Sequence, residues 1–331
     1  ARCLEVSRVR IDSLHVPLAS GPVVADLASQ PAPADALPPA EIARRCERAG
    51  VAKANLSLPA TLGLAVLAGA FIALGAVFMT TVTTGAAALP FGLGRLLGGL
   101  VFSLGLILVV LAGAELFTGN NLMVMACANG TVSLARLLRN WVVVYLGNFL
   151  GAAGLAGLVF LSRQYAAAGG AVGANALAIA AAKVSLGFVP AVALGVLCNA
   201  LVCLAVWLCF GGRSAADRIL AIVFPVTAFV AAGFEHSVAN MYFIPMGLFI
   251  KGFDPAFAGA TGVSLANLTL RGFLVGNLLP VTIGNILGGA GLVGLAYWLI
   301  YLRPERAGRA RQERPAPAGE SEERVLAEVG R

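Results

Sequence analysis

The chain has 331 residues, of which 59% are hydrophobic and 12% are charged, with a formal net charge of +7. Soluble domains usually carry about a quarter charged residues, so this composition excludes an ordinary soluble protein. Residues 60–94 and 184–212 carry no charge at all. Each run exceeds the roughly 20 apolar residues that cross a bilayer as a helix. In neither run do hydrophobic and polar residues alternate at every second position, as they do in the strands of membrane barrels. The sequence therefore predicts an all-α membrane protein.

The first 55 residues form an expected cytoplasmic N-terminal segment. They contain no apolar stretch of the kind that precedes a signal-peptide cleavage site. Residues 31–39 are rich in Pro and Ala, which predicts a flexible lead-in, and residues 41–53 predict a short amphipathic surface helix. The six cysteines are scattered without a C-x-x-C pair, so we expect no disulfide framework, metal site or cofactor.

Six membrane spans are expected within a transmembrane channel domain at residues 56–302. Their predicted ranges are 60–82, 94–128, 133–161, 184–210, 217–250 and 272–302. The second and fifth spans are too long for one straight crossing and contain polar residues midway, so both are predicted to be broken helices. Residues 303–331 are polar and rich in Pro and Arg, which predicts a disordered cytoplasmic tail.

The basic residues predict the orientation of these spans. With six spans, both termini lie on one side of the membrane. That side holds eighteen of the 23 Lys and Arg residues, and the opposite side holds five. Because basic residues concentrate in cytoplasmic segments, both termini are predicted to be cytoplasmic.

The two halves of the chain repeat each other. Residues 140–151 (NWVVVYLGNFLG) and 277–288 (NLLPVTIGNILG) share the pattern N-x6-G-N-x-L-G. The spacing from Glu to Asn in ELFTGN also recurs in EHSVAN, and each copy lies at a predicted helix break. A unit of three spans is odd, so the second copy is inserted upside down. Inverted repeats with paired broken helices place a conduction site near the midplane, which predicts transport.

Two residues at the breaks are the main candidates for contact with a solute. Thr118 lies in the first break, and its hydroxyl can donate to an anion without trapping it by charge. His236 lies in the second break and is the only histidine of the membrane region. Ionisable groups inside a bilayer are costly and are usually functional, and imidazole titrates near neutrality. The alternative for His236 is a satisfied core residue.

Other polar and apolar residues have an expected role and a structural alternative. Asn199 is either a pore-lining amide donor or a helix–helix hydrogen-bonding residue. Lys183, at the outer mouth of the fourth span, either attracts anions or marks the membrane interface. Four further polar residues are expected to support the break loops: Glu115, Asn120, Glu235 and Asn240. Three apolar residues are expected to narrow the pore, with ordinary packing as their alternative: Phe102, Leu106 and Phe229.

These segments resemble the formate/nitrite transporter family over most of residues 55–302. The matching runs are FSLGLIL (102–108), GAELFTGNNL (113–122), NWVVVYLGN (140–148), CLAVW (203–207), GFEHSVANMYFIPMG (233–247) and NLLPVTIGNILGG (277–289). The resemblance implies an aquaporin-like protomer with its own pore, assembled into a homopentamer in the bacterial cytoplasmic membrane.

The resemblance also implies where the candidate residues lie. Thr118 is expected in an omega-shaped loop, with His236 facing it across a central chamber. Asn199 is expected to line the passage and Lys183 to stand in the outer vestibule. Inner and outer apolar constrictions are expected to contain Phe102, Phe229 and Leu106.

We therefore expect proton-coupled transport of small monovalent weak-acid anions, with formate first and nitrite also carried. The anion is expected to take its proton from His236 directly or through water held near it. A nitrite- or hydrosulfide-selective channel and an aquaporin-like pore for neutral solutes are the alternatives, although the paired NPA-type motif of such pores is absent. An intramembrane enzyme is not expected, because a zinc protease needs clustered His and carboxylate ligands. The positive charge reflects membrane topology, and no nucleic-acid partner is expected.

Overall fold

The computed structural model describes residues 36–306. The predicted flexible lead-in and most of the predicted tail at 303–331 lie outside the described residues. The described start of that tail, residues 303–306, continues the last helix. The boundaries predicted for the N-terminal segment, channel domain and tail remain predictions.

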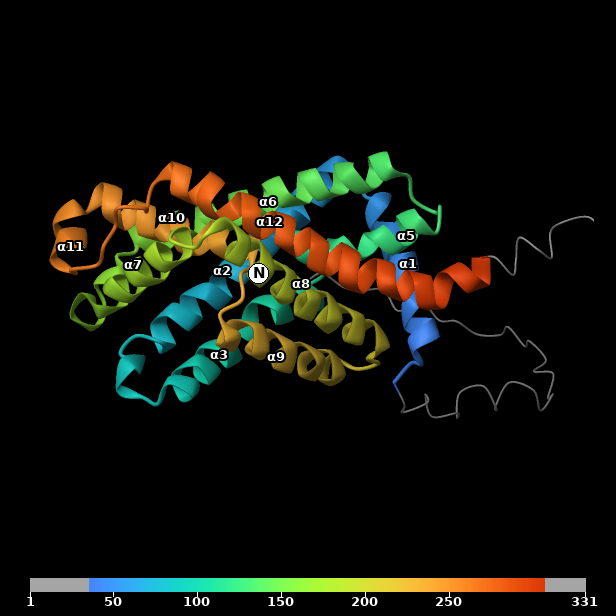
Figure 1. Ribbon diagram of the computed structural model, residues 1–331, viewed down its shortest axis with the longest axis horizontal. Helices are drawn as coiled ribbons and strands as arrows, with labels where there is room; N and C mark the ends of the chain where they lie inside the picture. The colour runs from blue at the N-terminus through green and yellow to red at the C-terminus, as the bar shows by residue number, and fades with distance from the viewer. Residues whose placement is uncertain (1–35, 307–331) are drawn as a thin grey trace, which may run out of the picture. The chain divides into compact units, whose positions relative to one another are not determined.

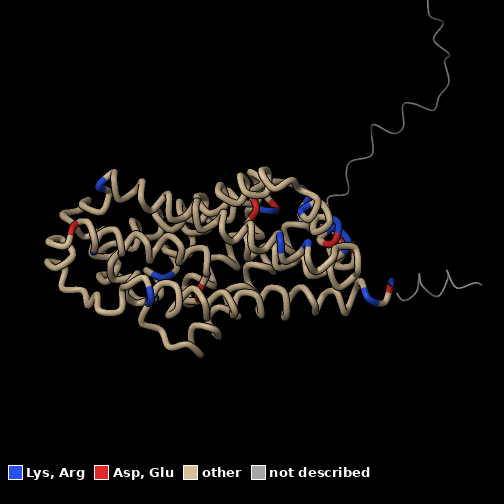
Figure 2. The backbone as a smooth tube through the Cα atoms, turned by 90° about the horizontal axis from the view of Figure 1, so that it is seen from above, with Lys and Arg blue, Asp and Glu red and all other residues tan. Residues whose placement is uncertain are grey.

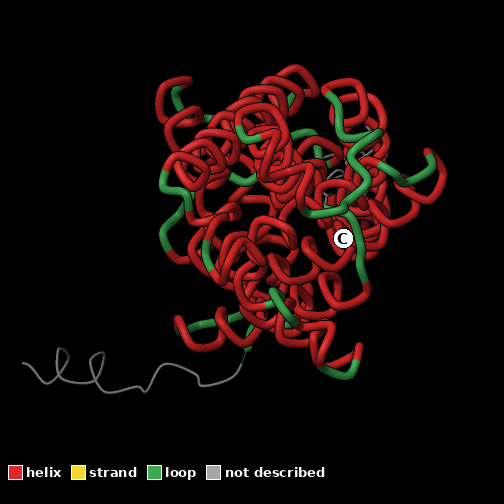
Figure 3. The backbone as a smooth tube through the Cα atoms, turned by 90° about the vertical axis from the view of Figure 1, so that its left-hand side faces the viewer, coloured by secondary structure: helices red, strands yellow, loops and turns green. Residues whose placement is uncertain are grey.

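The described part of the chain consists of helices joined by loops and contains no strand (Figures 1 and 3). Six helical segments are long and apolar enough to cross a membrane, as predicted. They are α2 (Leu58–Val82), α3 (Phe91–Leu111), α6 (Leu134–Leu161), α8 (Phe188–Gly211), α9 (Ala215–Ala232) and the segment Gly272–Arg306. The last segment contains α12 (Leu279–Ile286) between π-helical stretches η5 (Gly272–Leu278), η6 (Leu287–Leu295) and η7 (Trp298–Leu302).

Shorter helices complete the two broken spans and flank the repeats. The first broken span continues through α4 (Phe117–Asn120), η2 (Asn121–Met123) and α5 (Val124–Ala128), and the second through α10 (Ser237–Phe253). The remaining elements are α1 (Pro39–Ala54), α7 (Ala171–Val184), α11 (Pro255–Ala260) and the short turns η1 (Ala86–Ala88), η3 (Gln164–Ala166) and η4 (Ala168–Gly170).

Both predicted breaks are present, and each starts at a glycine with a positive φ. Gly113 (φ 79°) follows the end of α3, and Gly233 (φ 78°) follows the end of α9. Glycine adopts this left-handed conformation without steric cost and so ends a helix cleanly. The chain then runs extended through Leu116 and His236 before α4 and α10 begin.

The order and packing of the helices repeat between the halves. In the first half α2 packs against α3 and α6, and in the second half α8 packs against α9 and α12. Contacts between α3 and α9 join the two halves. Each repeat is also preceded by a helix, because α1 ends just before α2 and α7 ends just before α8. The sequence predicted the first of these two helices at 41–53 but not α7, and it predicted neither as part of the repeat.

Glycines allow the backbones of the paired spans to approach closely. A Cβ at Gly151 of α6 would overlap the Val66 carbonyl of α2. At the equivalent place in the second half, a Cβ at Gly288 would overlap the Val196 carbonyl of α8. Small residues commonly permit such close crossings in membranes, where packing and hydrogen bonds drive helix association.

The helix α1 is docked onto the spans rather than lying free beside them. Its apolar face is buried at Ile42, Ala43 and Cys46, which are at most 6% exposed. It packs against α8, α5 and η7. Figure 2 shows charged residues gathered at the end where α1 lies. The sequence predicted an amphipathic helix here and did not indicate its buried position.

Candidate functional site

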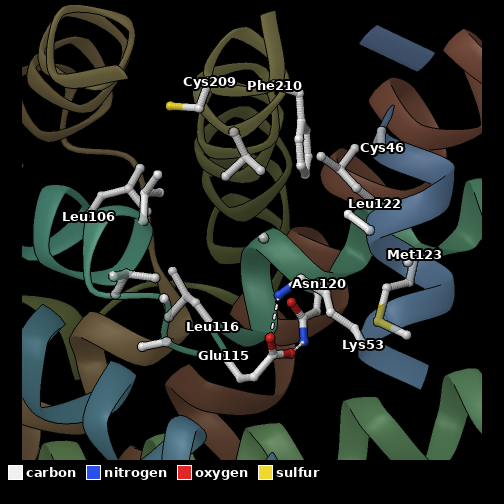
Figure 4. A pocket seen from close by; sticks show the side chains of 18 of the residues that line it. Cys46, Lys53, Leu106, Glu115, Leu116, Asn120, Leu122, Met123, Cys209 and Phe210 are labelled. Atoms are coloured by element: carbon white, nitrogen blue, oxygen red, sulfur yellow. Dashed lines mark hydrogen bonds and ion pairs between the residues drawn. The ribbon is translucent and has the colours of Figure 1, made fainter. Parts of the chain in front are cut away.

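Each break is anchored by a buried glutamate that binds a lysine and an asparagine. Glu115 accepts from Lys53 Nζ (2.6 Å) and from Asn120 Nδ2 (2.7 Å), as Figure 4 shows. Glu235 accepts from Lys183 Nζ (2.9 Å) and Asn240 Nδ2 (2.7 Å). Both glutamates are at most 5% exposed. A buried carboxylate needs this pairing, because an unpaired buried charge is costly.

In each anchor, the asparagine that binds the glutamate also donates to a further asparagine. Asn120 also donates to Asn140 Oδ1 (2.9 Å), and Asn240 donates to Asn277 Oδ1 (2.7 Å). Asn277 Nδ2 then donates to the Lys183 carbonyl (2.9 Å). The equivalent Asn140 Nδ2 is buried and has no hydrogen-bond partner among the described residues. In the anchor around Lys183 the corresponding unpaired atom is Asn240 Oδ1, so each anchor has one buried amide atom without a partner among the described residues.

A second asparagine in each half fixes the extended backbone of the break. Asn148 Oδ1 accepts from the Phe117 N–H (2.9 Å), while its Nδ2 donates to the Glu115 carbonyl (2.9 Å). Asn285 Oδ1 accepts from the Ser237 N–H (2.9 Å), and its Nδ2 donates to the Glu235 carbonyl (2.9 Å). Both side chains are fully buried. They satisfy backbone groups that the helix breaks would otherwise leave without partners in an apolar interior.

The two breaks bring Thr118 and His236 into direct contact. Thr118 Oγ1 lies 2.9 Å from His236 Nε2, although the residues are 118 positions apart in sequence. Thr118 is fully buried and His236 is 3% exposed. The sequence placed these two residues at facing breaks, and the structure places them within hydrogen-bonding distance.

The second ring nitrogen of His236 fixes the direction of that hydrogen bond. His236 is the N-cap residue of α10, and its Nδ1 accepts from the Ala239 N–H (3.0 Å). A neutral imidazole carries one proton, which must therefore lie on Nε2. Nε2–H donates to Thr118 Oγ1, and the hydroxyl hydrogen of Thr118 remains available to another acceptor. The pair thus presents a donor to an anion without a formal charge.

Three cavities lie in series across the contact between the breaks. A cavity of about 360 Å³ on the α1 side shares Leu106 and Leu116 with a small central chamber. The chamber has a volume of about 10 Å³ and is lined by His236. It shares His236, Phe102 and Phe229 with a cavity of about 280 Å³ on the other side. Shared lining residues therefore connect both cavities through the chamber.

The apolar residues at the two boundaries of the chamber narrow the route. Phe102 and Phe229 contact each other edge to face, with ring centroids 6.0 Å apart, so both lie at the boundary away from α1. Leu106 and Leu116 lie at the boundary toward α1. A volume of about 10 Å³ is at the lower limit for one water molecule. The described conformation is therefore closed to any larger solute.

Asn199 is buried behind the chamber and lines none of these three cavities. Its Nδ2 lies within hydrogen-bonding distance of the Asn121 side chain (2.9 Å), the Asn285 carbonyl (2.7 Å) and the Thr118 carbonyl (3.3 Å). These contacts hold the first break against α8 and α12. The geometry matches the structural alternative for Asn199 rather than the expectation of a pore-lining amide.

The cavity away from α1 is lined by Lys183, together with Arg95, which the sequence did not single out. The Lys183 charge is paired with Glu235. Arg95 donates to the Val230 carbonyl (2.7 Å) and the Ala231 carbonyl (2.9 Å) at the end of α9. A guanidinium at a helix C-terminus binds carbonyls that have no intrahelical partner. Arg95 thus secures the edge of the second break.

Sequence reasoning missed Lys53, Arg95, Leu116, Asn148 and Asn285 as parts of the site. Lys53 had a usable signal, since KANL (53–56) and KVSL (183–186) share the pattern K-x-x-L shortly before α2 and α8. Asn148 and Asn285 were visible in the repeated motif but received no role. The described residues contain no group of three His, Cys, Asp or Glu side chains placed to hold a metal ion.

Comparisons with known proteins agree with this architecture. The family described as formate/nitrite transporter matches residues 40–299. The Formate channel FocA of Escherichia coli K12 is 50% identical over 275 residues, covering 82% of this chain and 96% of the relative. The Probable formate transporter of Methanothermobacter thermautotrophicus is 40% identical over 287 residues, covering 80% and 97%. A solved structure titled "Pentameric formate channel with formate bound" superimposes with a TM-score of 0.70 at 48% identity, covering 74% of this chain and 98% of that one.

Proposed function

Because this chain belongs to the formate/nitrite transporter family, we propose that it transports formate, and also nitrite, across a membrane. The observation that carries the proposal is the contact between Thr118 and His236, because His236 lines a chamber between two apolar boundaries. Relatives named as formate channels or transporters support formate as the first substrate. The protein acts as a channel or transporter and not as an enzyme.

A monovalent anion enters one of the two large cavities and sheds water at an apolar boundary. In the chamber it accepts a hydrogen bond from the Thr118 hydroxyl, which His236 Nε2–H orients. Such neutral donors replace part of the lost hydration without holding the ion by a full charge. The side chains of Phe102, Leu106 and Phe229 rotate to let the solute pass, because the chamber volume of about 10 Å³ is otherwise too small.

The proton that neutralises a weak-acid anion reaches the chamber through water. His236 Nδ1 accepts from the Ala239 N–H, so the imidazole has no free lone pair for a second proton. Direct donation from Nε2 would leave an imidazolate unless that N-cap bond first opened. Dehydration disfavours the charged form of the weak acid, which favours its protonation at this point. Transport is therefore coupled to protons, with His236 positioning the hydroxyl donor.

Several features of the cellular context accompany this proposal. The protein lies in a bacterial cytoplasmic membrane with both termini cytoplasmic, which the distribution of basic residues supports. It assembles as a homopentamer in which each protomer has its own pore. The similarity to a structure titled as a pentameric formate channel supports that assembly.

Solute entry into proteoliposomes tests the proposal. The purified full-length protein is reconstituted, and entry of formate, nitrite, hydrosulfide and glycerol is followed by stopped-flow light scattering against protein-free vesicles. The proposal predicts entry of formate and nitrite well above the lipid background and no added glycerol entry. Glycerol entry without anion entry would instead indicate a neutral-solute pore.

A further inference from the structure

The cavity on the α1 side contains two arginines whose side chains other described residues leave unpaired. Arg45 of α1 and Arg218 of α9 both line this cavity of about 360 Å³. Both residues are half-buried. Neither guanidinium makes a hydrogen bond or an ion pair within residues 36–306, and Arg218 Nε is shielded from solvent. Guanidinium groups in such places normally have acceptors, because a buried donor without one is costly.

The carboxylates near these arginines are already engaged. Glu115 in the cavity wall is bonded to Lys53 and Asn120. Glu41 of α1 is paired with Arg44 and Arg48.

On α9, Asp217 accepts from the backbone N–H groups of Arg213 and Ser214. Burial raises the pKa of the Cys46 thiol to about 12, so this wall residue is neutral at physiological pH. Among the lining residues, three cationic groups therefore face one carboxylate, and two positive charges are left over.

The opposite cavity shows that an arginine in this fold can be satisfied by protein groups. Arg95 binds two carbonyls at the end of α9. No equivalent contact exists for Arg218 in the described structure. On the α1 side, Arg218 Nε therefore remains a buried donor with no acceptor among the described residues. A guanidinium binds a carboxylate through two parallel hydrogen bonds, and two guanidinium groups suit a ligand with two carboxylates.

We propose that Arg45 and Arg218 form a binding site for a short dicarboxylate in the α1-side cavity, and that this ligand blocks the route to the chamber. Apolar side chains of the same wall, including Leu122, Met123 and Phe210, suit a short carbon chain (Figure 4). A dianion cannot shed its hydration at the apolar boundary of Leu106 and Leu116, so it occupies the cavity without passing. The block rests on the proposed transport function, whereas the binding does not.

Calorimetric titration of the purified full-length protein with succinate tests the binding. Sodium chloride at equal ionic strength serves as the reference. Arg45→Gln and Arg218→Gln are each expected to weaken succinate binding about tenfold, the size of one charge-assisted hydrogen bond. Arg48→Gln is the matched control, because Arg48 is exposed on the same helix and lies outside the cavity lining. Arg218→Lys checks Arg218 if the glutamine variant fails to fold, and weaker binding is expected because the paired hydrogen bonds are lost.

Three outcomes would overturn the site: no succinate binding above the chloride reference, equal binding by Arg45→Gln and the unmodified protein, or equal weakening by Arg48→Gln.

Formate uptake by proteoliposomes with succinate on both sides tests the block. The inhibitory succinate concentration should rise about tenfold in Arg45→Gln. Formate uptake that succinate never inhibits would overturn the block. Arginine-dependent succinate binding without any formate uptake would keep the site and overturn the proposed transport function.

Discussion

His236 is held through both of its ring nitrogens, which determines what it can do. Nδ1 caps α10 by accepting from the Ala239 N–H, and Nε2 contacts Thr118. The sequence predicts a functional role for this lone membrane histidine, because ionisable groups are rare in bilayers. The tautomer could not be predicted, since it depends on a hydrogen bond formed only when the break folds. The proposed function accordingly assigns His236 the orientation of a hydroxyl instead of the donation of its own proton.

Thr118 gives a direct test of that arrangement. Thr118→Val removes the hydroxyl at nearly constant volume, so Nε2–H of His236 is left buried without its acceptor. A buried donor without a partner costs about 1–3 kcal/mol, and the anion also loses its donor. We expect formate uptake to fall about tenfold or more in stopped-flow measurements. Thr118→Ser keeps the hydroxyl and should retain most of the uptake; equal loss in both variants would contradict the account.

The ion pair between Lys183 and Glu235 is predicted to stabilise the folded protein. The two side chains are 15% and 6% exposed. Lys183→Met leaves Glu235 buried beside only its asparagine partners, and breaking such a pair typically costs about 3–5 kcal/mol. We expect a clear fall in the thermal unfolding midpoint of the detergent-solubilised protein. The double variant Lys183→Met/Glu235→Gln should recover much of that loss, and no recovery would show that the charge pair is not the cause.

At the scale of elements, the sequence predicted the spans well and the connections between them poorly. The second span was expected over 94–128, and the structure divides it at Gly113 into α3 and α4 to α5. Hydropathy and glycine placement carry that information locally. The docking of α1 and the pairing of Lys53 with Glu115, 62 residues apart, depend on how separate helices meet. No local pattern encodes such contacts, so only the matching positions of Lys53 and Lys183 could have suggested them.

The close crossing of α2 and α6 predicts a sharp difference between two glycines of one helix. Gly151→Ala would drive a methyl group into the Val66 carbonyl, whereas a Cβ at Gly154 meets nothing within 4 Å. Overpacking typically costs about 1–3 kcal/mol. Gly154→Ala should leave the free energy of unfolding unchanged or raise it by about 0.5–1 kcal/mol, because alanine has the higher helix propensity. Thermal unfolding midpoints compare the variants, and equal midpoints would contradict the crossing described here.

At the scale of the whole molecule, inverted repetition accounts for most of the site. The duplicated motif predicts two breaks that face each other, and the structure places equivalent Lys–Glu–Asn sets at both. The contents of the two large cavities are not equivalent. Besides the equivalent lysines Lys53 and Lys183, one cavity is lined by Arg45 and Arg218 and the other by Arg95. The motif did not predict this asymmetry, because it lies in residues that the repeats do not share.

The measurement that tests the central claim most directly follows formate uptake and lumen pH together. Proteoliposomes containing a pH-sensitive dye are given formate at acidic and at neutral external pH. The comparison is between the unmodified protein, His236→Ala and Ser237→Ala. Ser237 is the matched control, because it is the next residue in the same break and its hydroxyl has no hydrogen-bond partner among the described residues.

The account predicts that uptake by the unmodified protein and by Ser237→Ala depends on external pH and changes lumen pH in step. His236→Ala should lose about tenfold or more of the uptake, because the hydroxyl donor of Thr118 is no longer oriented. The uptake that remains should still depend on external pH, because the proton comes through water. Formate uptake by His236→Ala at the normal rate would contradict the role of His236 in transport.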